Sequence, residues 1–461
     1  MTLDIFRNSL VTENILADLR DGLIGEGVMI PSANGDVPLV YADYVASGRA
    51  LQQVEDYVQK HVLPFYANTH TEDSFCGRYT GQLREAARAE IARLTGASDG
   101  NSVVFTGSGA TAGLNRLVAL LNVDKAKNPV VFIGPYEHHS NILPWRESRA
   151  KVVEIPETKN GGPDLAALAQ ALEHHADADL KIGSFSAASN VTGVITDTDP
   201  VTRLLKSNGA LAVWDYAGGG PYLAIDMATG TDAEKDAVVI SPHKFPGGPG
   251  ASGVMIVRDA AVKRQTPTWP GGGTVAFVSP WEHEYLDDII SREEAGTPNI
   301  IGDIRAALAF IVKDVIGQKT IEAREAELNA MAIKGWADNP YLTLLGTEMD
   351  HRLPIFSFLV HDAAENSIHY AEVTQKLSDI YGIQSRGGCA CAGPYGHRLL
   401  EVDQPHSESL HRQLSAGDLQ AKPGWIRLNF SYLMNDKTAQ YIIDSVDELT
   451  RDLASQHRLA G

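Results

Sequence analysis

The chain has 461 residues, and the 44% that are hydrophobic indicate a folded protein with a large buried core. Its length corresponds to roughly two or three domains. The 58 acidic and 39 basic residues give a net charge of −19. This charge excludes nucleic acid and anionic membranes as the expected main partners, because both bind through clustered Lys and Arg.

The first residues, "MTLDIFRNSLVTEN", lack the basic and apolar segments of a signal peptide. No apolar run approaches the ~20 residues needed to cross a bilayer, and three cysteines are too few for a disulfide scaffold. We therefore expect a cytoplasmic protein. Residues 1–40 are expected to form an N-terminal segment that packs near the C-terminal domain.

Residues 41–330 are predicted to form a large α/β domain. From Ser102 onward, short apolar runs rich in β-branched residues alternate with amphipathic stretches such as "GATAGLNRLVALLN" and "DLAALAQALEHHA". The predicted strands cover residues 102–106, 129–135, 151–155, 180–187, 211–216, 237–241 and 253–258. This alternation predicts a mostly parallel sheet with helices on both faces, in which ligands bind beyond the carboxyl ends of the strands.

Residues 331–461 are predicted to form a smaller α+β domain. "RLPIFSFLV" and "WIRLNFSYLMN" have the pattern of strands, and "SIHYAEVTQKLSDIYG" and "KTAQYIIDSVDELTRDL" have the pattern of helices. Between them lies "RGGCACAGPYGH", residues 386–397, with Cys389 and Cys391 one residue apart. We call this segment the cysteine loop.

"FTGSGATAG" joins the first predicted strand of the large domain to a helix. Gly107, Gly109 and Ala112 match the G-x-G-x-x-A form of the dinucleotide-binding motif, so a nicotinamide oxidoreductase is one interpretation. However, no acidic residue ends the next predicted strand to hold a ribose. A narrower interpretation is a phosphate site made by backbone N–H groups at the helix N-terminus and the Thr111 hydroxyl. A plain tight turn is the structural alternative.

Polar side chains follow three predicted strands: Glu137, His138 and His139; Asp215; and Ser241, His243 and Lys244. Lys244 lies between two apolar runs, and burial of an unpaired ammonium lowers its pKa and favours attack on a carbonyl. The alternative is a lysine in a surface loop. A phosphate loop, an aspartate, a histidine and a lysine are together the set that pyridoxal 5'-phosphate (PLP) requires. Lys244 would then form the Schiff base, Asp215 would hold the pyridine nitrogen protonated and His138 would stack on the ring.

Around these residues the chain resembles the class V aminotransferases, a family of fold-type I PLP enzymes, and within it the cysteine desulfurases. The resemblance runs from "YADYVASGRA" near residue 41 to "WIRLNFSYLMN" near residue 425, and includes "EHHSNILPW", "SNVTGVITD", "SPHK" and "EAGTPN". "YANTHTEDSFCGRYTGQLREAAR" resembles the family segment that carries an Asn-x-His. The resemblance implies a fold-type I architecture and a homodimer with shared active sites. It also implies a small amino acid as substrate and a sulfur-acceptor protein as a further partner.

The resemblance implies roles for individual residues as well. The PLP phosphate would be bound by Gly109, Ala110, Thr111, Ser241 and His243. Thr274, in "PGGGT", would reach the phosphate of the neighbouring subunit, and Asn190 would face the ring hydroxyl. Arg427 would clamp the substrate α-carboxylate with its bidentate guanidinium, and Arg386 and His70 would contribute to substrate binding.

In the desulfurases a catalytic cysteine follows Arg-x-Gly-x-x, a spacing that Arg386, Gly388 and Cys391 reproduce. The resemblance thus implies that Lys244 moves the substrate Cα proton. A Cys391 thiolate would then take the sulfur of L-cysteine as a persulfide and release L-alanine. A PLP-dependent C–S lyase and a class V transaminase are the alternatives within the family. A non-catalytic sulfur-acceptor or scaffold protein is the alternative outside it.

The sequence departs from the family pattern in three places. Cys389 stands where some relatives have histidine, "AGPYGH" is stiffer than a mobile catalytic loop requires, and Gly218 stands where relatives often have glutamine. A zinc site at the cysteine pair would need two more ligands where only His397 is near, so no metal is expected. A disulfide across one residue is strained. Two inert buried thiols are the structural alternative, and Cys76 is interpreted as structural.

Overall fold

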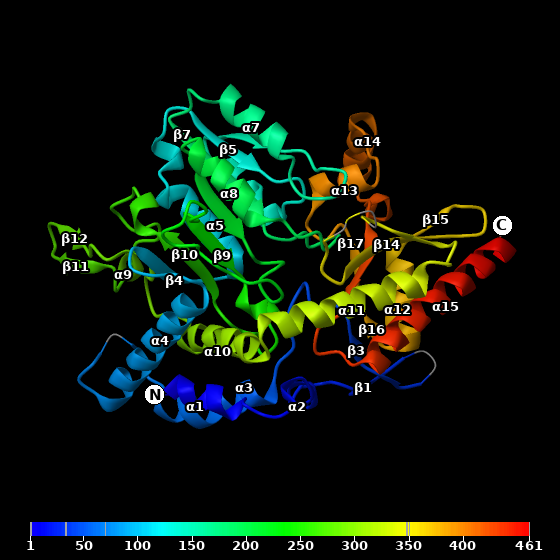
Figure 1. The fold of residues 1–461 in the computed structure, drawn as a ribbon, viewed down its shortest axis with the longest axis horizontal. Helices are drawn as coiled ribbons and strands as arrows, with labels where there is room; N and C mark the ends of the chain where they lie inside the picture. The colour runs from blue at the N-terminus through cyan, green and yellow to red at the C-terminus, as the bar shows by residue number, and fades with distance from the viewer. Residues whose placement is uncertain (1, 33–34, 70, 347–348, 350, 461) are drawn as a thin grey trace.

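The computed structural model gathers its helices and strands around two sheets that lie side by side (Figure 1). It describes residues 2–32, 35–69, 71–346, 349 and 351–460. The larger sheet consists, in spatial order, of β4 (Asn101–Gly107), β10 (Gly253–Arg258), β9 (Ala237–Ile240), β8 (Leu211–Asp215), β7 (Leu180–Ser186), β5 (Pro129–Ile133) and β6 (Lys151–Glu154). β10 runs antiparallel to both of its neighbours, β4 and β9, and the other neighbouring strands of this sheet pair in parallel. The predicted mostly parallel α/β fold is therefore confirmed.

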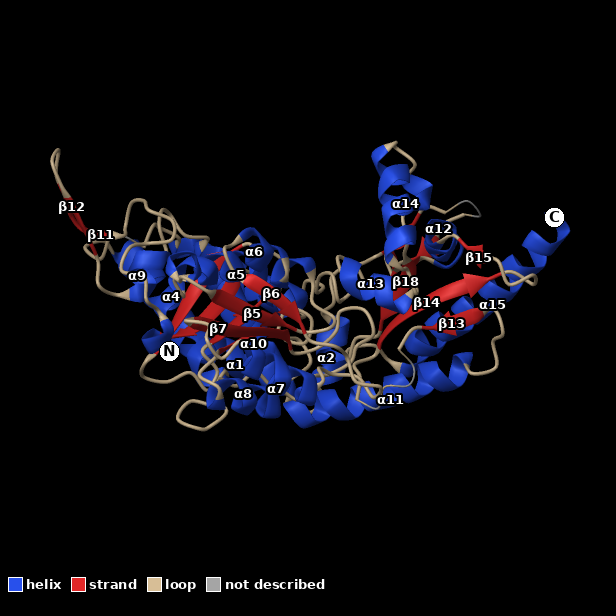
Figure 2. Ribbon diagram, turned by 90° about the horizontal axis from the view of Figure 1, so that it is seen from above, coloured by secondary structure: helices blue, strands red, loops and turns tan. Residues whose placement is uncertain are grey.

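Helices cover both faces of this seven-stranded sheet (Figure 2). Because successive side chains of a strand point to opposite faces, Val104 belongs to one apolar cluster while Val103 and Phe105 belong to another. The first cluster includes α5 (Gly109–Leu120) and α6 (Leu143–Glu147). The second includes α4 (Phe75–Leu94), α7 (Leu165–His174), α8 (Thr198–Ser207) and α10 (Ile300–Ile316). The parallel strands are thus buried on both faces of the sheet, and their carboxyl ends lie together at one edge of it.

The smaller sheet is antiparallel and brings the cysteine loop beside a predicted substrate residue. Its strands are, in spatial order, β13 (Leu342–Leu344), β14 (Ile355–His361), β18 (Trp425–Asn429) and β17 (Arg386–Gly388), with β15 (Ser367–Ile368) also paired to β14. The helices α12 (Tyr370–Tyr381) and α15 (Asp436–Ala460) pack against it. Because Arg386 pairs with Arg427 across β17 and β18, the loop begins next to the strand that carries Arg427.

One unbroken helix, α11 (Gln318–Trp336), joins the two halves of the chain. Its first turn places Ile321 in an apolar cluster of the larger sheet, whereas Leu328 and Trp336 belong to the core of the smaller sheet. The domain boundary between residues 330 and 331 stays a prediction, and α11 crosses it without interruption (Figure 1).

The N-terminal segment divides between the two sheets. The helices α1 (Thr2–Ser9) and α2 (Ile15–Asp21) bury Phe6 and Leu19 in a cluster of the larger sheet, and Arg20 of α2 donates to the Leu433 carbonyl at 2.7 Å. The helix α1 packs against α4 and α10, and α2 packs against α10. The hairpin of β1 (Met29–Ile30) and β2 (Val37–Pro38) lies against α12, and β3 (Val40–Tyr41) pairs with β16 (Ile383–Gln384).

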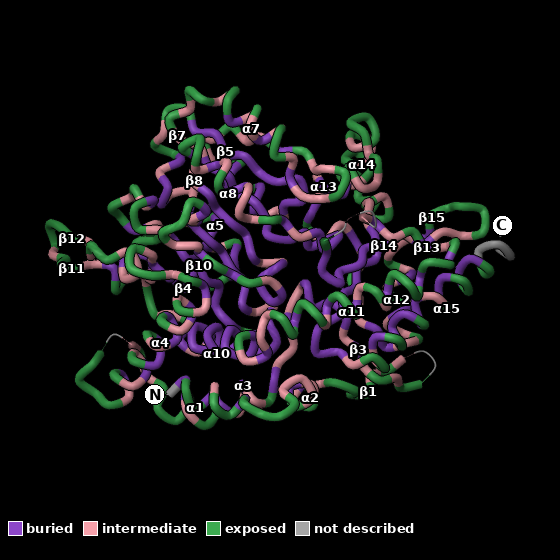
Figure 3. The backbone as a smooth tube through the Cα atoms, viewed as in Figure 1, coloured by how far each residue is buried: buried purple, intermediate pink, exposed green. Residues whose placement is uncertain are grey.

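Several elements were not predicted from the sequence. They include α1, α2, α3 (Gln52–Tyr57), α4, α6, α9 (Ile289–Glu293), α10, α11, α13 (Gly393–Leu399), α14 (Gln404–Ser415), and a hairpin of β11 (Val275–Val278) and β12 (His283–Tyr285). The hairpin projects from the larger half and is largely exposed (Figure 3). Trp281 at its turn is 90% exposed. Within the described ranges, no helix has the length and apolar character needed to cross a membrane.

Candidate active site

Most of the residues predicted for the site line one cavity of about 240 Å³ between the two sheets. Those that line it are Gly109, Ala110, Thr111, His138, Asn190, Asp215, Ser241, His243, Lys244, Arg386, Cys391 and Arg427. Thr274 does not line it, and His70 lies outside the described residues. The cavity sits at the carboxyl ends of the parallel strands β7, β8 and β9, where open α/β sheets bind ligands.

Lys244 ends a short helical turn, Pro242–Lys244, that follows β9. The surrounding protein strips water from the ammonium group and lowers its pKa to about 8, an effect that the Asp215 carboxylate opposes. Within the described ranges, no hydrogen bond or ion pair holds the Lys244 side chain. It is therefore a weakly solvated amine that exchanges protons near neutral pH.

Asp215 is the last residue of β8 and is buried. Its Oδ1 accepts a hydrogen bond from the Ala217 N–H at 2.7 Å. Desolvation raises the pKa of this carboxyl, while the Ala217 N–H and the Lys244 ammonium act in the opposite direction. A cationic ring nitrogen placed against Asp215 would offset the cost of desolvation.

The two histidines of the cavity are uncharged. Burial, followed by repulsion from Lys244, lowers the pKa of His138 to about 3. The same two causes lower the pKa of His243 to about 4. His138 Nδ1 accepts a hydrogen bond from the Ser140 N–H at 3.1 Å, which fixes the orientation of its ring. A neutral, oriented imidazole suits stacking on an aromatic ring.

The N-terminus of α5 forms a polar cradle. The side chain of Ser108, which precedes the helix, makes no capping hydrogen bond, and Gly109, Ala110 and Thr111 of the first turn line the cavity. The Ala110 N–H donates to Ser241 Oγ at 2.9 Å. Gly109 has a φ of 59°, and a Cβ there would lie 2.9 Å from Ser241 Oγ. A residue with a side chain at this position would thus displace Ser241 and His243 and would have to adopt a strained backbone.

Two arginines share one carboxylate at the other end of the cavity. Arg427 Nη2 donates to Asp43 Oδ1 at 2.7 Å, and Arg386 Nε donates to Asp43 Oδ2 at 3.0 Å. Arg427 Nη1 donates to the carbonyl of Asn190 at 3.0 Å, while its buried Nε has no hydrogen-bonding partner in the described structure. Because Arg427 lines the cavity, its guanidinium suits an additional anion such as a substrate carboxylate.

Asp43 is a site residue that the sequence reasoning missed. It lies in "YADYVASGRA", where the family resemblance begins, yet neither composition nor spacing singles out this aspartate. Its two arginine partners follow it by 343 and 384 residues, so only the fold brings them together.

The two cysteines of the loop differ in surroundings. Cys391 is exposed and lines the cavity. Cys389 is half-buried and packs against an apolar cluster that includes Tyr395 and Trp425. The ring of His397, considered above as a zinc ligand, hydrogen-bonds the Gly393 carbonyl and the Ser407 hydroxyl instead. Of the two thiols, Cys391 is thus the one that can meet a ligand beside Lys244.

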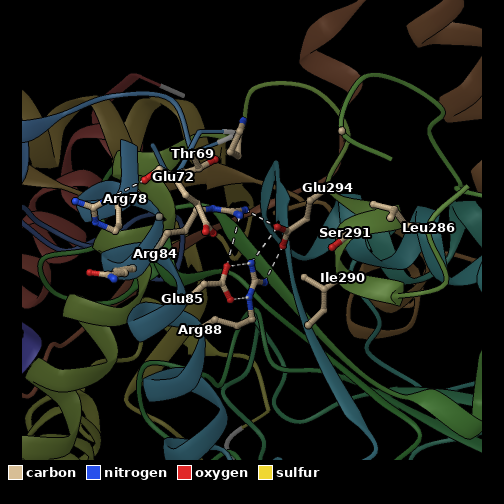
Figure 4. Close-up of a pocket in the computed structure, with 14 residues that line it drawn as sticks. Thr69, Glu72, Arg78, Arg84, Glu85, Arg88, Leu286, Ile290, Ser291 and Glu294 are labelled. Atoms are coloured by element: carbon tan, nitrogen blue, oxygen red, sulfur yellow. Dashed lines mark hydrogen bonds and ion pairs between the residues drawn. The ribbon is translucent and has the colours of Figure 1, made fainter. Parts of the chain in front are cut away.

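Glu294 and Pro298 of the "EAGTPN" motif line a second cavity of about 380 Å³, away from Lys244 (Figure 4). Glu294 pairs with Arg84 and with Arg88 at 2.8 Å, and it accepts the Phe105 N–H of β4 at 2.7 Å. This network ties α4 to the edge of the larger sheet. Thr274 lies on this side of the molecule, next to a residue that lines the second cavity, with its hydroxyl donating to the Gly271 carbonyl.

Comparison with known proteins agrees with this geometry, since residues 40–421 match the family model of the class-V aminotransferases. The chain belongs to the class-V aminotransferase family. It is 30% identical to a cysteine desulfurase of Enterobacter sp. (strain 638) over 373 residues, which cover 80% of this chain and 87% of that protein. It is 28% identical to a probable cysteine desulfurase of Vibrio cholerae over 367 residues, 78% of this chain and 86% of that protein.

Solved structures of the family share the fold. The apo cysteine desulfurase of Thermococcus onnurineus NA1 has a TM-score of 0.74 at 23% identity, covering 90% of this chain and 95% of that chain. The cysteine desulfurase CsdA of Escherichia coli has a TM-score of 0.70 at 22% identity, covering 90% and 94%. This class-V aminotransferase is therefore a fold-type I, PLP-dependent enzyme.

The residues of the cavity fit PLP on their own chemistry. The uncapped α5 N-terminus suits the phosphate, and buried Asp215 suits the ring nitrogen. Neutral His138 suits the ring face, and the weakly solvated Lys244 suits covalent attachment. When bound, PLP supplies an electron sink for the substrate Cα, a chemistry that no side chain here provides.

Proposed function

We propose that this enzyme is a cysteine desulfurase that converts L-cysteine and its own Cys391 thiol into L-alanine and a Cys391 persulfide. The observation that carries the proposal is that Cys391 lines the same cavity as Lys244 and Arg427. A thiol, a proton-transferring amine and a guanidinium for the α-carboxylate are the groups that this reaction requires. The relatives that are named cysteine desulfurases support it.

Lys244 is the proposed proton carrier. Because its pKa is lowered to about 8, the amine and the ammonium are both accessible near neutral pH, as proton removal and return at Cα require. Arg427 is the proposed anchor of the α-carboxylate. Its contacts with Asp43 and the Asn190 carbonyl fix the guanidinium at the wall of the cavity that Lys244 also lines.

Cys391 is the proposed nucleophile. Its thiolate attacks the substrate sulfur, so that an S–S bond forms while the Cβ–S bond breaks. The electron pair of the broken bond stays with the carbon chain, which takes up a proton to give the methyl group of alanine. The transferred sulfur is oxidised as Cβ is reduced, and the reaction therefore needs no external oxidant or reductant.

We further propose that two copies of the chain complete each other's sites. Thr274 is buried outside the Lys244 cavity, so its predicted contact with a cofactor phosphate requires a second copy. The hairpin that follows it exposes Phe277 and Trp281, which supports an interface there. His70 is proposed to act in substrate binding, and a sulfur-acceptor protein is proposed as a further partner. A reducing compartment such as the cytoplasm suits a catalytic thiol.

The proposed function is tested by incubating the PLP-loaded enzyme with L-cysteine and measuring L-alanine, pyruvate and protein-bound persulfide. We expect alanine and persulfide in equal amounts during the first turnover. The Cys391→Ser variant should lose both by about 100-fold or more, because it lacks the sulfur nucleophile. Cys389→Ser serves as the matched control two residues away, and it should retain most of the activity.

Two outcomes would contradict the proposal. Pyruvate and ammonia as main products would assign the enzyme to the C–S lyases, and alanine formation that is equal in the two serine variants would remove Cys391 from the reaction. The Lys244→Ala variant should lose the yellow colour of the bound cofactor, which a nicotinamide enzyme would not show.

A further inference from the structure

The cysteine loop contains a strained stretch of backbone. Ala390 has a φ of 50° and Cys391 a φ of 57°, so two consecutive residues with side chains adopt the left-handed region. Such a conformation costs roughly 1–2 kcal/mol per residue, and it persists only where neighbouring groups hold it. The contacts that hold Cys391 in this conformation therefore decide how its thiol is presented.

Three hydrogen bonds from the larger half of the molecule hold this stretch. The His139 N–H donates to the carbonyl of Cys391 at 2.8 Å, and the Gly393 N–H donates to His139 Nε2 at 2.9 Å. Asn190 Nδ2 donates to the carbonyl of Ala390 at 2.9 Å. His139 thus binds the loop on both sides of Ala392, with its backbone on one side and its ring on the other.

The ring of His139 must be neutral to make its bond, because Nε2 accepts the Gly393 N–H. Desolvation, helped by the charges of Arg146 and Lys422, lowers the pKa of His139 and keeps it in this form. The residues after the loop are fixed as well. The Tyr395 hydroxyl donates to Glu157 Oε1 at 3.2 Å and lies 3.2 Å from Thr192 Oγ1.

We propose that His139 is a positioning residue that holds the cysteine loop in place and fixes the Cys391 thiol at the cavity wall. This inference rests on the proposed role of Cys391 in sulfur transfer. It accounts for the stiff sequence "AGPYGH", since a loop clamped in the reactive position has no need to swing. Holding two reacting groups in place lowers the entropic part of a barrier, and a misplacement of about 1 Å costs up to ~100-fold in rate.

The test compares His139→Leu with His139→Gln. Both retain the backbone bond to Cys391, and leucine fills similar space without an acceptor, whereas the glutamine carbonyl can accept the Gly393 N–H. We expect His139→Leu to lower kcat for alanine formation by about 10- to 100-fold with little change in KM. His139→Gln should recover most of that loss. His411→Ala, an exposed histidine on α14, is the control and should leave activity unchanged.

A second readout does not depend on turnover. Hydrogen exchange of the peptide that covers residues 386–397 should become severalfold faster in His139→Leu than in the wild type, and much less so in His139→Gln. His139→Ala replaces the leucine variant if the latter does not fold.

The proposal is overturned if His139→Leu retains wild-type kcat and wild-type exchange, or if leucine and glutamine have equal effects. Failure of the proposed function looks different, because the wild type itself would then form neither alanine nor persulfide. In that case the exchange measurement still decides whether His139 holds the loop.

Discussion

Burial sets the charge of the ionisable side chains around the cavity. His138 and His243 are neutral because their pKa values are lowered to about 3 and 4, so Lys244 meets no cationic imidazole. Besides burial, the positive charges of Arg427 and Arg386 lower the pKa of Lys244, and the Asp43 carboxylate partly offsets their effect. As a result, Lys244 can lose its proton near neutral pH and act as a neutral amine.

The attachment of PLP to the apoenzyme should therefore depend on pH through Lys244. Its pKa is lowered to about 8, so the reactive amine is the minor form below that pH and the major form above it. We expect the rate of cofactor attachment to rise with pH up to about 8 and then to level off. The measurement is the growth of visible cofactor absorbance after mixing.

The Asp215→Asn variant provides the control for this pH dependence. The Asp215 carboxylate raises the pKa of Lys244, so its removal should move the break in the pH profile to a lower value. A wild-type profile that levels off only near pH 10 would show instead that the ammonium of Lys244 is well hydrated.

At the scale of elements, the N-terminus of α5 is the part of the site whose shape depends most on a single residue. The helix dipole favours an anion there, and Gly109 allows Ser241 and His243 to approach closely. A side chain at this position would press against Ser241 and His243, which line the same cavity.

Gly109→Ala should weaken PLP binding by about 10-fold or more, because the new methyl group lies 2.9 Å from Ser241 Oγ and the alanine must adopt a positive φ. Gly107→Ala is a matched control, since Gly107 also has a positive φ but nothing lies within 4 Å of the position that its new methyl group would take. Titration of the apoenzyme with PLP measures both. Equal weakening in the two variants would attribute the effect to backbone strain alone.

Elements that the sequence predicted well are those with a local pattern. The strands before Asp215 and Lys244 are short apolar runs, and the rule that ligands bind beyond strand ends then located the site. α10 was missed because it is buried on nearly all sides and has no polar face to reveal a helical period. The contact of His139 with the cysteine loop was not predictable, because Gly393 follows it by 254 residues.

At the scale of the whole molecule, the β11–β12 hairpin carries apolar side chains that this copy of the chain leaves uncovered. Phe277 is 52% and Trp281 90% exposed, on an arm that projects from the larger half (Figure 1). Large exposed apolar side chains that cluster on one arm mark an interaction site. The adjacent Thr274, which does not reach the Lys244 cavity of its own chain, connects this surface to the proposed shared sites.

The double change Phe277→Ser and Trp281→Ser should shift the protein from dimer toward monomer, because it removes the apolar surface proposed for the interface. Sedimentation velocity at micromolar concentration measures the distribution. Leu419→Ser is the control, since Leu419 is an exposed apolar residue (74%) on the smaller half. A wild-type monomer, or a variant that is as dimeric as the wild type, would contradict the proposal.

The continuous helix α11 has a consequence for dividing the chain into fragments. A cut at residue 330 would leave Leu328 on the N-terminal piece and Trp336 on the C-terminal piece, although both side chains belong to the core of the smaller sheet. That core also takes Val40, Ala42 and Tyr44 from the beginning of the chain. Neither fragment would carry the complete core of the smaller sheet, so we expect the C-terminal fragment to fold only when it is expressed together with the rest of the protein.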